Sequence, residues 1–564
     1  MIPFEELKEQ LLAYLHAEQD MEKSDIERQK TMTTAEKVEA NMLLPGLVIE
    51  KSLHNLYVLS ARENYSKLRS GDKVLIRQEG ADRAAKAMVL DTFTDSITIE
   101  CNAELDKNAA FEIETESPNL LQSLIGCLAG IMPGTPGAAF LRNLSGEEAI
   151  ETEDYMKLEP EEISGYQKIF SSLNTDSQSA VRSMLEFPSI HVLQGPPGTG
   201  KTHVLAATAI GASLSKREVV IIANTHHAVN NALLSIHEMN PKIPLFKIGE
   251  ELKADELGDA AIKFSGFKDY NEYSRKNKRK KKFGYVVGMT IWGAITNLGL
   301  RQHGHFRPYF ALVDEASLMP LTYASILGKC ATSICLFGDS RQMPPIFRPE
   351  LETHRFSQSI LDFCANNVEG IKVSVLPVTY RMNDEITSVI SKSFYEPHGI
   401  KLICSEQSLG KRFKSQYFSS RQLDGSLVYI KPETGTECKE WNKEEAKAVI
   451  ALVSALLAEG RKPTDIAVIT PFRKQVRTLR ECANEVIPKK SQPLIDTVER
   501  LQGQDVECII LSFATSSETY LNEMKPFLFN ENRLNVMISR AKTKVVIFGS
   551  AIVQEELKKI LVIS

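Results

Sequence analysis

A glycine-rich octapeptide constrains the fold of this chain more than any other feature. It reads Gly195-Pro196-Pro197-Gly198-Thr199-Gly200-Lys201-Thr202, follows an apolar run at 190–193 and precedes a helical pattern at 202–212. A strand, a glycine-rich turn and a helix start surround a phosphate with backbone N–H groups, and a Cβ in the turn would block their approach. The octapeptide therefore predicts a nucleotide triphosphate site, in which Lys201 binds phosphate oxygens and the Thr202 hydroxyl ligates Mg²⁺. A chance match in a Gly/Pro loop is the alternative.

Apolar, β-rich runs alternate with helical stretches from residue 190 onward. The runs lie at 190–193, 219–222, 309–313, 334–337, 427–430, 466–469, 508–511 and 545–548. Near-continuous apolar strands separated by helices are typical of parallel sheets that are covered on both faces. The number of runs predicts two such α/β domains rather than one.

The part of the chain before residue 160 has a different texture. Residues 4–40 are highly charged and carry apolar positions at helical spacing, which predicts a long, largely exposed helix. Short apolar or alternating runs separated by turn signals fill 43–115 and predict a small β-barrel. Further helical stretches begin at about 118 and about 158.

The composition is that of an ordinary globular protein, with 43% hydrophobic residues, 25% charged residues and a formal net charge of −5. Any affinity for nucleic acid would therefore come from a local basic groove rather than from overall charge. The nine cysteines include no CxxC pair and no zinc spacing, which disfavours a zinc module and fits buried thiols in a reducing, cytoplasmic setting.

Neither a secretory signal nor a membrane span is expected. The first residues lack the basic and apolar regions of a signal peptide. The segment 120–141 carries only apolar and uncharged polar residues, but prolines and glycines at 133–137 interrupt it. The remaining helical piece is too short to cross a bilayer, so a buried helix followed by a loop is predicted.

Two acidic residues, Asp314 and Glu315, follow the predicted strand at 309–313. A phosphoryl-transfer site needs one carboxylate to hold Mg²⁺ and one base to orient the attacking water, roles that suit Asp314 and Glu315 respectively. Gln342 follows the next strand, and its amide is a candidate sensor of the γ-phosphate. The alternative for Gln342 is a loop whose prolines merely end the domain.

Further segments match one family in the expected order. They are 173–181 with Gln178, 376–382 with Tyr380 and Arg381, 497–505 with Gly503 and Asp505, and 533–542 with Arg540. On these segments and the octapeptide, the chain resembles the superfamily 1 helicases of the Upf1-like branch over roughly residues 160–550. The resemblance implies two RecA-like domains with ATP bound between them.

The resemblance also implies roles for these residues at the nucleotide. Gln178 would read the adenine edge, Tyr380 would stack on the base, and Gly503 and Asp505 would contact the nucleotide. The family usually carries Gln at the position of Thr379 and Glu at the position of Asp505.

Arg381 and Arg540 would act as arginine fingers. A guanidinium from the second domain completes the charge around the transferring phosphoryl group only when the cleft between the domains closes. Hydrolysis would then be coupled to opening and closing of that cleft. The alternative for each arginine is a surface or interdomain salt bridge.

Small polar and basic side chains in both domains are candidates for gripping a single strand without reading its sequence. At the places of the family's strand-binding segments they are Thr225, Thr290, Pro471, Arg473 and Thr497. Each is equally consistent with a helix cap or a turn residue.

A basic run lies between these segments. Seven of the eight residues at 275–282 are basic, including Lys278, Arg279, Lys280, Lys281 and Lys282. In the family a small inserted subdomain at this place lies over the bound strand, and phosphate neutralisation there would raise affinity and its salt dependence. A solubilising loop and a nuclear localisation signal are the alternatives.

We therefore expect two RecA-like parallel-sheet domains, a barrel on a helical stalk, and a short basic insertion. The expected bounds are 1–42 and 116–157 for the stalk, 43–115 for the barrel, 158–232 and 285–347 for the first RecA-like domain, 233–284 for the insertion, and 348–564 for the second RecA-like domain.

The expected activity is that of an ATP-dependent helicase or translocase on single-stranded DNA or RNA, and the resemblance implies 5′→3′ movement. One alternative is a nucleic-acid-stimulated ATPase that acts as a clamp or remodeller, with a partner protein supplying nuclease or regulatory function. A P-loop kinase is the other, and it would not need arginines from a second domain.

Overall fold

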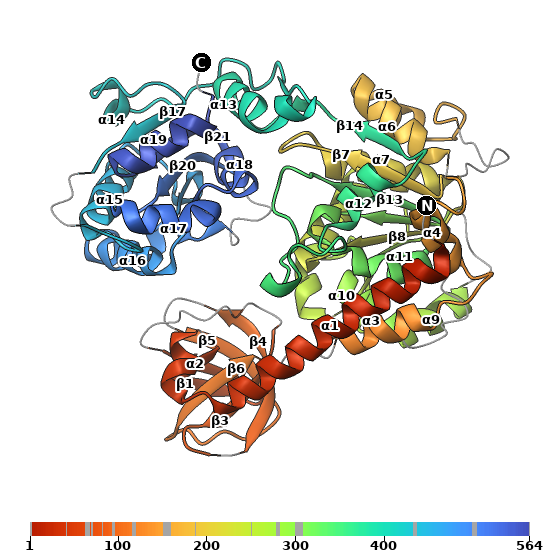
Figure 1. Cartoon of the computed structure of the whole chain (residues 1–564), viewed down its shortest axis with the longest axis horizontal. Helices are drawn as coiled ribbons and strands as arrows, with labels where there is room; N and C mark the ends of the chain where they lie inside the picture. Colours follow the sequence, from red (N-terminus) through yellow and green to blue (C-terminus); the bar gives the residue numbers. More distant parts are fainter. Residues whose placement is uncertain are drawn as a thin grey trace.

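The structure, a computed structural model, describes residues 3–40, 42–61, 68, 72–81, 83–92, 96–115, 120–150, 159–186, 188–249, 251–277, 283–298, 308–432, 437–498 and 505–562. Figure 1 shows a closed barrel and two helix-covered sheets. All strand pairings within the two large sheets are parallel. This confirms the predicted α/β class.

The barrel consists of antiparallel strands in the order β1-β2-β5-β4-β3-β6. Alternate residues of β5 are buried, because successive side chains of a strand point to opposite faces. The inward residues, such as Leu59, Val74 and Ile97, form a core of their own. The bounds are β1 Leu43–Leu53, β2 Leu56–Ser60, β3 Lys73–Gln78, β4 Ala84–Thr92, β5 Ser96–Cys101 and β6 Ala110–Thr115.

A long helix, α1 (Phe4–Thr31), joins the barrel to the first sheet (Figure 1). Its buried side chains Leu7, Leu11 and Leu15 share one core with the first sheet and with the helices α3 and α4. The uncharged segment 120–141 is divided between α3 (Leu120–Ala129) and α4 (Pro136–Ser145), and α2 (Thr34–Glu39) leads into the barrel. Among the described residues no helix has the length and apolar character needed to span a membrane.

The first large sheet has eight strands in the order β10-β9-β11-β8-β12-β13-β7-β14. They are β7 Ile190–Gln194, β8 Val219–Ala223, β9 Leu245–Ile248, β10 Ile262–Phe264, β11 Val286–Thr290, β12 Phe310–Val313, β13 Ser333–Gly338 and β14 Lys372–Val375. Helices cover both faces, which explains why the central strands are continuously apolar.

The helices of this domain divide between the two faces of the sheet. One face packs on α6 (Thr175–Leu185), α7 (Lys201–Leu214) and α8 (His226–Met239), with the short α5 (Gln167–Ser171) beside them. The other packs on α9 (Phe267–Asn277), α10 (Ile291–Leu298), α11 (Ala324–Cys330) and α12 (Ile360–Asn367) as well as on the stalk.

Two expected domain boundaries differ from the structure. Strand β14 pairs with β7 and α12 packs into the same core, so the first domain continues to residue 375 instead of ending at 347. Strands β9 and β10 extend the sheet on the opposite side, so 233–284 is not a separate insertion. All three strands are short, and the two at the edges of the sheet, β10 and β14, are partly or mostly exposed, so they lack the apolar run that marks a central strand.

The second large sheet has five strands in the order β17-β21-β20-β18-β19. They are β17 Leu427–Ile430, β18 Ile466–Ile469, β19 Leu494–Asp496, β20 Val506–Ser512 and β21 Ala541–Phe548. One face packs on α15 (Lys443–Ala458) and α16 (Arg473–Val486), beside the short α14 (Gln416–Ser419). The other packs on α13 (Asp384–Ile390), α17 (Glu518–Leu528), α18 (Glu531–Ser539) and α19 (Ala551–Ile560).

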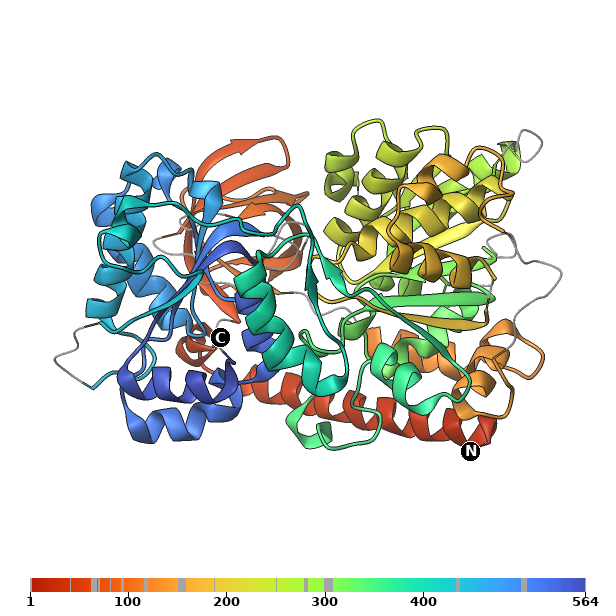
Figure 2. The ribbon, with the colours of Figure 1, turned by 90° about the horizontal axis from the view of Figure 1, so that it is seen from above.

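The chain passes from the first sheet to the second at Leu376 and Pro377. The Leu376 N–H donates to the Gln194 carbonyl at 3.0 Å, at the end of β7. A two-stranded sheet of β15 (Val378–Thr379) and β16 (Ile403–Cys404) follows. In Figure 2 this connection runs between the two domains. The crossing therefore lies beside the start of the glycine-rich octapeptide.

Candidate active site

The octapeptide forms the loop between β7 and α7. Gly198 and Gly200 have φ angles of +72° and +84°, a left-handed backbone that favours glycine. A Cβ added to Gly198 would lie 2.4 Å from the Arg381 Cβ and 2.8 Å from the Thr379 Oγ1. The second domain therefore touches the loop, and glycine is needed at 198 for this approach as well as for the turn. We call the region where the two domains meet the seam: it includes the contact between 195–202 and 378–381 and the neighbouring residues Glu315, Asp505 and Arg540.

The Lys201 ammonium is turned into the loop. Its Nζ donates to the carbonyl of Gly195 and, at 3.3 Å, to that of Pro196. Burial lowers the pKa of Lys201, and the negative charges of Asp339 and Asp314 oppose this shift. The Lys201 ammonium group thus lies beside the N-terminus of α7, a position that favours phosphate oxygens.

The predicted acidic pair lies at the carboxyl end of β12. Asp314 is buried, and its carboxylate accepts the Glu315 N–H at 2.9 Å. Glu315 has a φ of +55°, an uncommon conformation for a residue with a side chain. Burial, together with the Asp314 charge, raises the pKa of Glu315 to about 7. A carboxyl group with such a pKa is suited to accept a proton from water near neutral pH.

Thr379 fastens the second domain to the loop. Its Oγ1 donates to the Pro197 carbonyl at 2.9 Å, and the Tyr380 N–H donates to the Gly198 carbonyl at 2.8 Å. Thr379 has no exposed surface. Thr379 stands where the family usually has glutamine. Its hydrogen bond to the backbone of the other domain could not be predicted from the sequence.

Both predicted arginine fingers face the seam. Arg540, which follows α18, is only 7% exposed. Burial lowers the pKa of Arg540 to about 10, Arg381 adds to this shift, and Glu315 and Asp505 oppose it. Arg381 Nη1 donates to the Ser539 carbonyl at 3.2 Å, and its Nε lies 4.0 Å from the Asp505 carboxylate. Asp505 thus lies between Arg381 and Lys542, whose Nζ is 3.2 Å from the same carboxylate oxygen, an arrangement that the sequence did not predict.

Two buried polar atoms on opposite sides of the seam have no hydrogen-bond partner among the described residues. They are Glu315 Oε2 in the first domain and Arg540 Nε in the second. Buried polar atoms are rarely left unpaired, and an unpaired one calls for an explanation such as a catalytic role or a bound ion or water. The seam therefore has the character of a binding site for a polar ligand.

The predicted adenine-binding residues lie at the start of α6 and on the second domain. Asn174 Nδ2 donates to the Tyr380 hydroxyl at 2.7 Å, and Tyr380 is 43% exposed. Gln178 Nε2 donates to the Leu173 carbonyl at 2.9 Å, so this amide stabilises the turn before α6. Asn174 also caps α6 through the Ser177 N–H. It is a site residue that we missed, although an Asn before a helical pattern is a cap signal.

Gln342 is tied to the strand that carries the loop. Its Nε2 donates to Asp339 Oδ2 at 2.6 Å, and Gln194 Nε2 donates to Asp339 Oδ1 at 2.7 Å. Gln194 is the last residue of β7. The predicted γ-phosphate sensor and the phosphate loop are therefore linked through one buried carboxylate, which the sequence did not single out.

Most of the residues predicted to bind a nucleic-acid strand at the family's strand-binding segments have buried side chains. The hydroxyls of Thr225 and Thr290 each accept the N–H three residues further on, at 3.1 Å, and cap helices. The side chains of Thr290, Pro471 and Thr497 are buried, whereas Thr225 is partly exposed and Arg473 is exposed. Thr225 and Thr290 thus act as helix caps, which was the alternative to strand binding. Of the five residues, only Arg473 and Thr225 have side chains that are accessible to a nucleic-acid strand.

Some predicted residues lie outside the described residues. They are Gly503 and the basic residues Lys278, Arg279, Lys280, Lys281 and Lys282.

Two oxygen donors beside the loop fit a hard cation. They are the buried Asp314 carboxylate and the hydroxyl of Thr202, in the first turn of α7. Mg²⁺ prefers such ligands and usually keeps water and phosphate oxygens as the others. Within the described ranges, no group of three or more His, Cys, Asp or Glu side chains is arranged to hold a metal. A magnesium ion here would depend on the phosphates for its remaining ligands.

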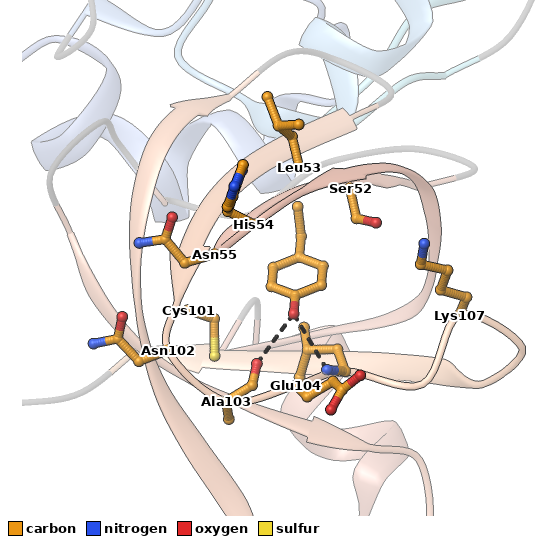
Figure 3. Close-up of a pocket in the computed structure, with 11 residues that line it drawn as sticks. Ser52, Leu53, His54, Asn55, Cys101, Asn102, Ala103, Glu104 and Lys107 are labelled. Carbon is orange, nitrogen blue, oxygen red and sulfur yellow. Dashed lines mark hydrogen bonds between the residues drawn. The ribbon is translucent and has the colours of Figure 1, made fainter.

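A separate pocket opens at one end of the barrel (Figure 3). The Tyr57 hydroxyl donates to the Ala103 carbonyl at 3.2 Å and accepts the Leu105 N–H at 3.4 Å. Its central polar group is therefore satisfied within the barrel. The pocket contains none of the predicted site residues.

The fold and the seam together define a P-loop protein with two parallel-sheet domains. Two family models, each described as an AAA domain, match residues 172–283 and 356–552, which together exceed half of the chain. Together with the helicases among its relatives, these matches confirm the resemblance of the chain to the superfamily 1 helicases of the Upf1-like branch.

Curated relatives agree with this assignment. The DNA replication ATP-dependent helicase/nuclease DNA2 of Bos taurus is 25% identical over 88% of this chain and 49% of its own length. The protein of the same name from Gallus gallus is 27% identical over 70% of this chain and 38% of its own length. This chain thus spans about half or less of the relatives it matches.

Among solved structures, the arterivirus nonstructural protein 10 helicase is similar over 91% of this chain and 80% of its own. The sequence identity is 11% and the TM-score is 0.42.

Proposed function

We propose that this protein is an ATP-dependent helicase or translocase on single-stranded nucleic acid, which couples ATP hydrolysis at the seam to stepping along the strand. One observation carries the proposal. Arg540 of the second domain is buried at the seam, where its charge interacts with Glu315 of the first. Hydrolysis at such a site depends on how the two domains approach each other, which is what a motor requires.

The side chains of the seam divide the chemistry among them. Lys201 binds the β- and γ-phosphates, and Glu315 accepts the proton of the attacking water. Gln342 senses the γ-phosphate, while Arg381 and Arg540 stabilise the charge that develops on the transferring group. Thr202 and Asp314 hold Mg²⁺, which when bound neutralises phosphate charge.

The nucleic-acid strand is proposed to cross both domains. The exposed Arg473 at the start of α16 and the partly exposed Thr225 at the start of α8 are the described candidates for contact with its phosphates. The relatives' names include DNA replication and helicase, which favours DNA over RNA. Movement from 5′ to 3′ rests on family resemblance alone.

We also propose a reducing intracellular location for the enzyme, because seven of the nine cysteines are buried, as is typical of structural thiols. The longer relatives are named helicase/nucleases. We therefore also propose that a partner protein or a further segment supplies any nuclease function.

The test combines two assays. ATP hydrolysis is measured alone and with single-stranded DNA or RNA of equal length, and strand displacement is measured on duplexes with a 5′ or a 3′ tail. We expect hydrolysis that a single strand stimulates, displacement from the 5′-tailed duplex, and no turnover by Lys201→Ala. The matched control, Lys168→Ala, removes an exposed lysine of α5 and should retain activity.

Each other outcome assigns a different function. Stimulated hydrolysis without displacement favours the ATPase clamp or remodeller. Hydrolysis that is indifferent to both nucleic acids contradicts the proposal and favours a P-loop enzyme with a small acceptor.

A further inference from the structure

One buried carboxylate collects hydrogen bonds from both domains. Asp339, which follows β13 and is 2% exposed, accepts Gln194 Nε2 at 2.7 Å and Gln342 Nε2 at 2.6 Å within its own domain. The Arg341 N–H adds a third donor at 3.1 Å. A further donor comes from the other domain: the Tyr395 hydroxyl lies 2.6 Å from Asp339 Oδ2.

Tyr395 in turn connects to the helix that precedes an arginine finger. Asn535 of α18 donates from Nδ2 to the Tyr395 hydroxyl at 2.8 Å and to the Arg341 carbonyl at 2.6 Å. Asn535 lies five residues before Arg540. A helix is stiff over that length, so a shift of Asn535 is passed on to Arg540.

The local structure fixes the Tyr395 side chain in this place. It ends a short π-helical segment, Ser391–Tyr395, that continues α13, and its side chain has no exposed surface. Such π-helical turns are rare and occur frequently at functional sites. A buried phenol must find a hydrogen-bond partner, and here the partner is a carboxylate, which makes the bond stronger than one between neutral groups.

We infer that Tyr395 is a positioning residue, whose hydroxyl links the Asp339–Gln342 loop to α18 so that Arg540 enters the seam in register with the γ-phosphate sensor. The inference rests on the proposed ATP hydrolysis. The chain of contacts is continuous from the base of the phosphate loop to the finger helix, through Gln194, Asp339, Tyr395 and Asn535. Tyr395 itself acts through this chain and not on the phosphates.

The test variant is Tyr395→Phe, which keeps the buried ring and removes only the hydroxyl. The matched control is Tyr166→Phe: Tyr166 also has no exposed surface, and its hydroxyl donates at 2.8 Å to the Ala207 carbonyl within the first domain. Loss of one hydrogen bond to a charged group should lower kcat about tenfold or more in Tyr395→Phe. The KM for ATP should change by less than about threefold, because phosphate binding by the loop is retained. The control should keep its kcat.

A second measurement does not depend on hydrolysis. Amide hydrogen exchange is compared for peptides that cover 339–342 and 531–540. Tyr395→Phe should exchange faster in both peptides, since it removes one of the two links between them and leaves only the bond from Asn535 to the Arg341 carbonyl. Tyr166→Phe should match the wild type there. The double variant Tyr395→Phe/Asn535→Ala should be no slower in turnover than the worse of its two single variants, because both side chains belong to one chain of contacts.

Two results would overturn the inference. One is a Tyr395→Phe enzyme with wild-type kcat and wild-type exchange. The other is an equal loss of kcat in both tyrosine variants, which would assign the effect to buried hydroxyls in general. If the wild type itself does not hydrolyse ATP, the proposed function fails, while the exchange comparison still decides whether Tyr395 links the two segments.

Discussion

Glu315 and Arg540 come from different domains, and their charges interact across the seam. Each carries a buried atom without a hydrogen-bond partner among the described residues, Oε2 on the acid and Nε on the base. Each also moves the pKa of the other in the direction that favours the charged forms. Opposite charges from the two domains thus meet beside the phosphate loop, and both residues can be tested separately.

Glu315 predicts a pH dependence. Its raised pKa of about 7 means that the ionised base becomes populated as pH rises through neutrality. We expect kcat/KM for ATP to increase between about pH 6 and about pH 8, because this ratio reports ionisation of the free enzyme. Glu315→Gln should lower kcat by about 10²-fold or more while ATP still binds. A wild-type profile that is flat over this range would argue against Glu315 as the base.

Arg540→Ala should reduce kcat by about 10³-fold, the usual effect of an arginine finger. Binding of ATP to the loop should persist and can be followed by equilibrium dialysis, since Lys201 remains. The control is Arg477→Ala, which removes an arginine of α16 with a side chain that is 52% exposed. Equal kcat values for the two variants would contradict the arginine-finger role of Arg540 and favour a role in an interdomain salt bridge.

Glu445 should make the second domain less stable at neutral pH than at acidic pH. This buried residue of α15 accepts Ser512 Oγ at 2.6 Å and the Ala514 N–H at 2.8 Å, yet burial still raises its pKa to about 7. The folded state therefore binds the proton more tightly than the unfolded state, whose carboxyl group has the ordinary value of 4.5. Stability from this group is fully present below pH 4.5 and is lost as pH rises to about 7.

The variant Glu445→Gln should lack this loss. Relative to the wild type, it should gain up to about 3 kcal/mol in the free energy of unfolding between pH 4.5 and about pH 8. Thermal melts across that range measure the gain. Glu523→Gln, at an exposed position of α17, is the control and should show no such trend.

The basic run predicts a salt effect. Changing Lys278, Arg279, Lys280, Lys281 and Lys282 to Gln should weaken single-strand binding and flatten its salt dependence, by about 0.7 in the logarithmic slope for each phosphate that the variant no longer neutralises. Fluorescence anisotropy from low to moderate salt gives this slope. Lys489→Gln/Lys490→Gln, at exposed positions of the second domain, should keep the wild-type slope. An unchanged slope in the first variant would mean that the run serves solubility.

Much of the fold could be predicted because its signals are local. Two of the three glycines of the octapeptide, Gly198 and Gly200, adopt the left-handed backbone, and central strands such as β8 and β12 are buried throughout. The edge strand β14 was missed because it is mostly exposed and pairs on one side only. Its place in the first sheet depends on β7, which lies far away in the sequence.

The site was predictable where a residue acts through its own chemistry. Lys201, Glu315, Arg381 and Arg540 converge on the seam from both domains. Residues that act through another residue were not predictable. Asn174 holds Tyr380, and Tyr395 holds Asp339, over separations of 206 and 56 residues, and no local pattern encodes such pairs.

The connection at Leu376 and Pro377 determines how far each part of the second domain would move if the two domains rotated relative to each other. The Leu376 N–H donates to the Gln194 carbonyl and so keeps the connection next to the phosphate loop. A rotation of the second domain about this connection would move the nearby guanidinium groups only a short distance. Points farther from the pivot, such as the start of α16, sweep a longer path for the same angle. In the proposed translocase, a small movement at the ATP site would therefore produce a larger displacement at the candidate strand-binding surface near Arg473.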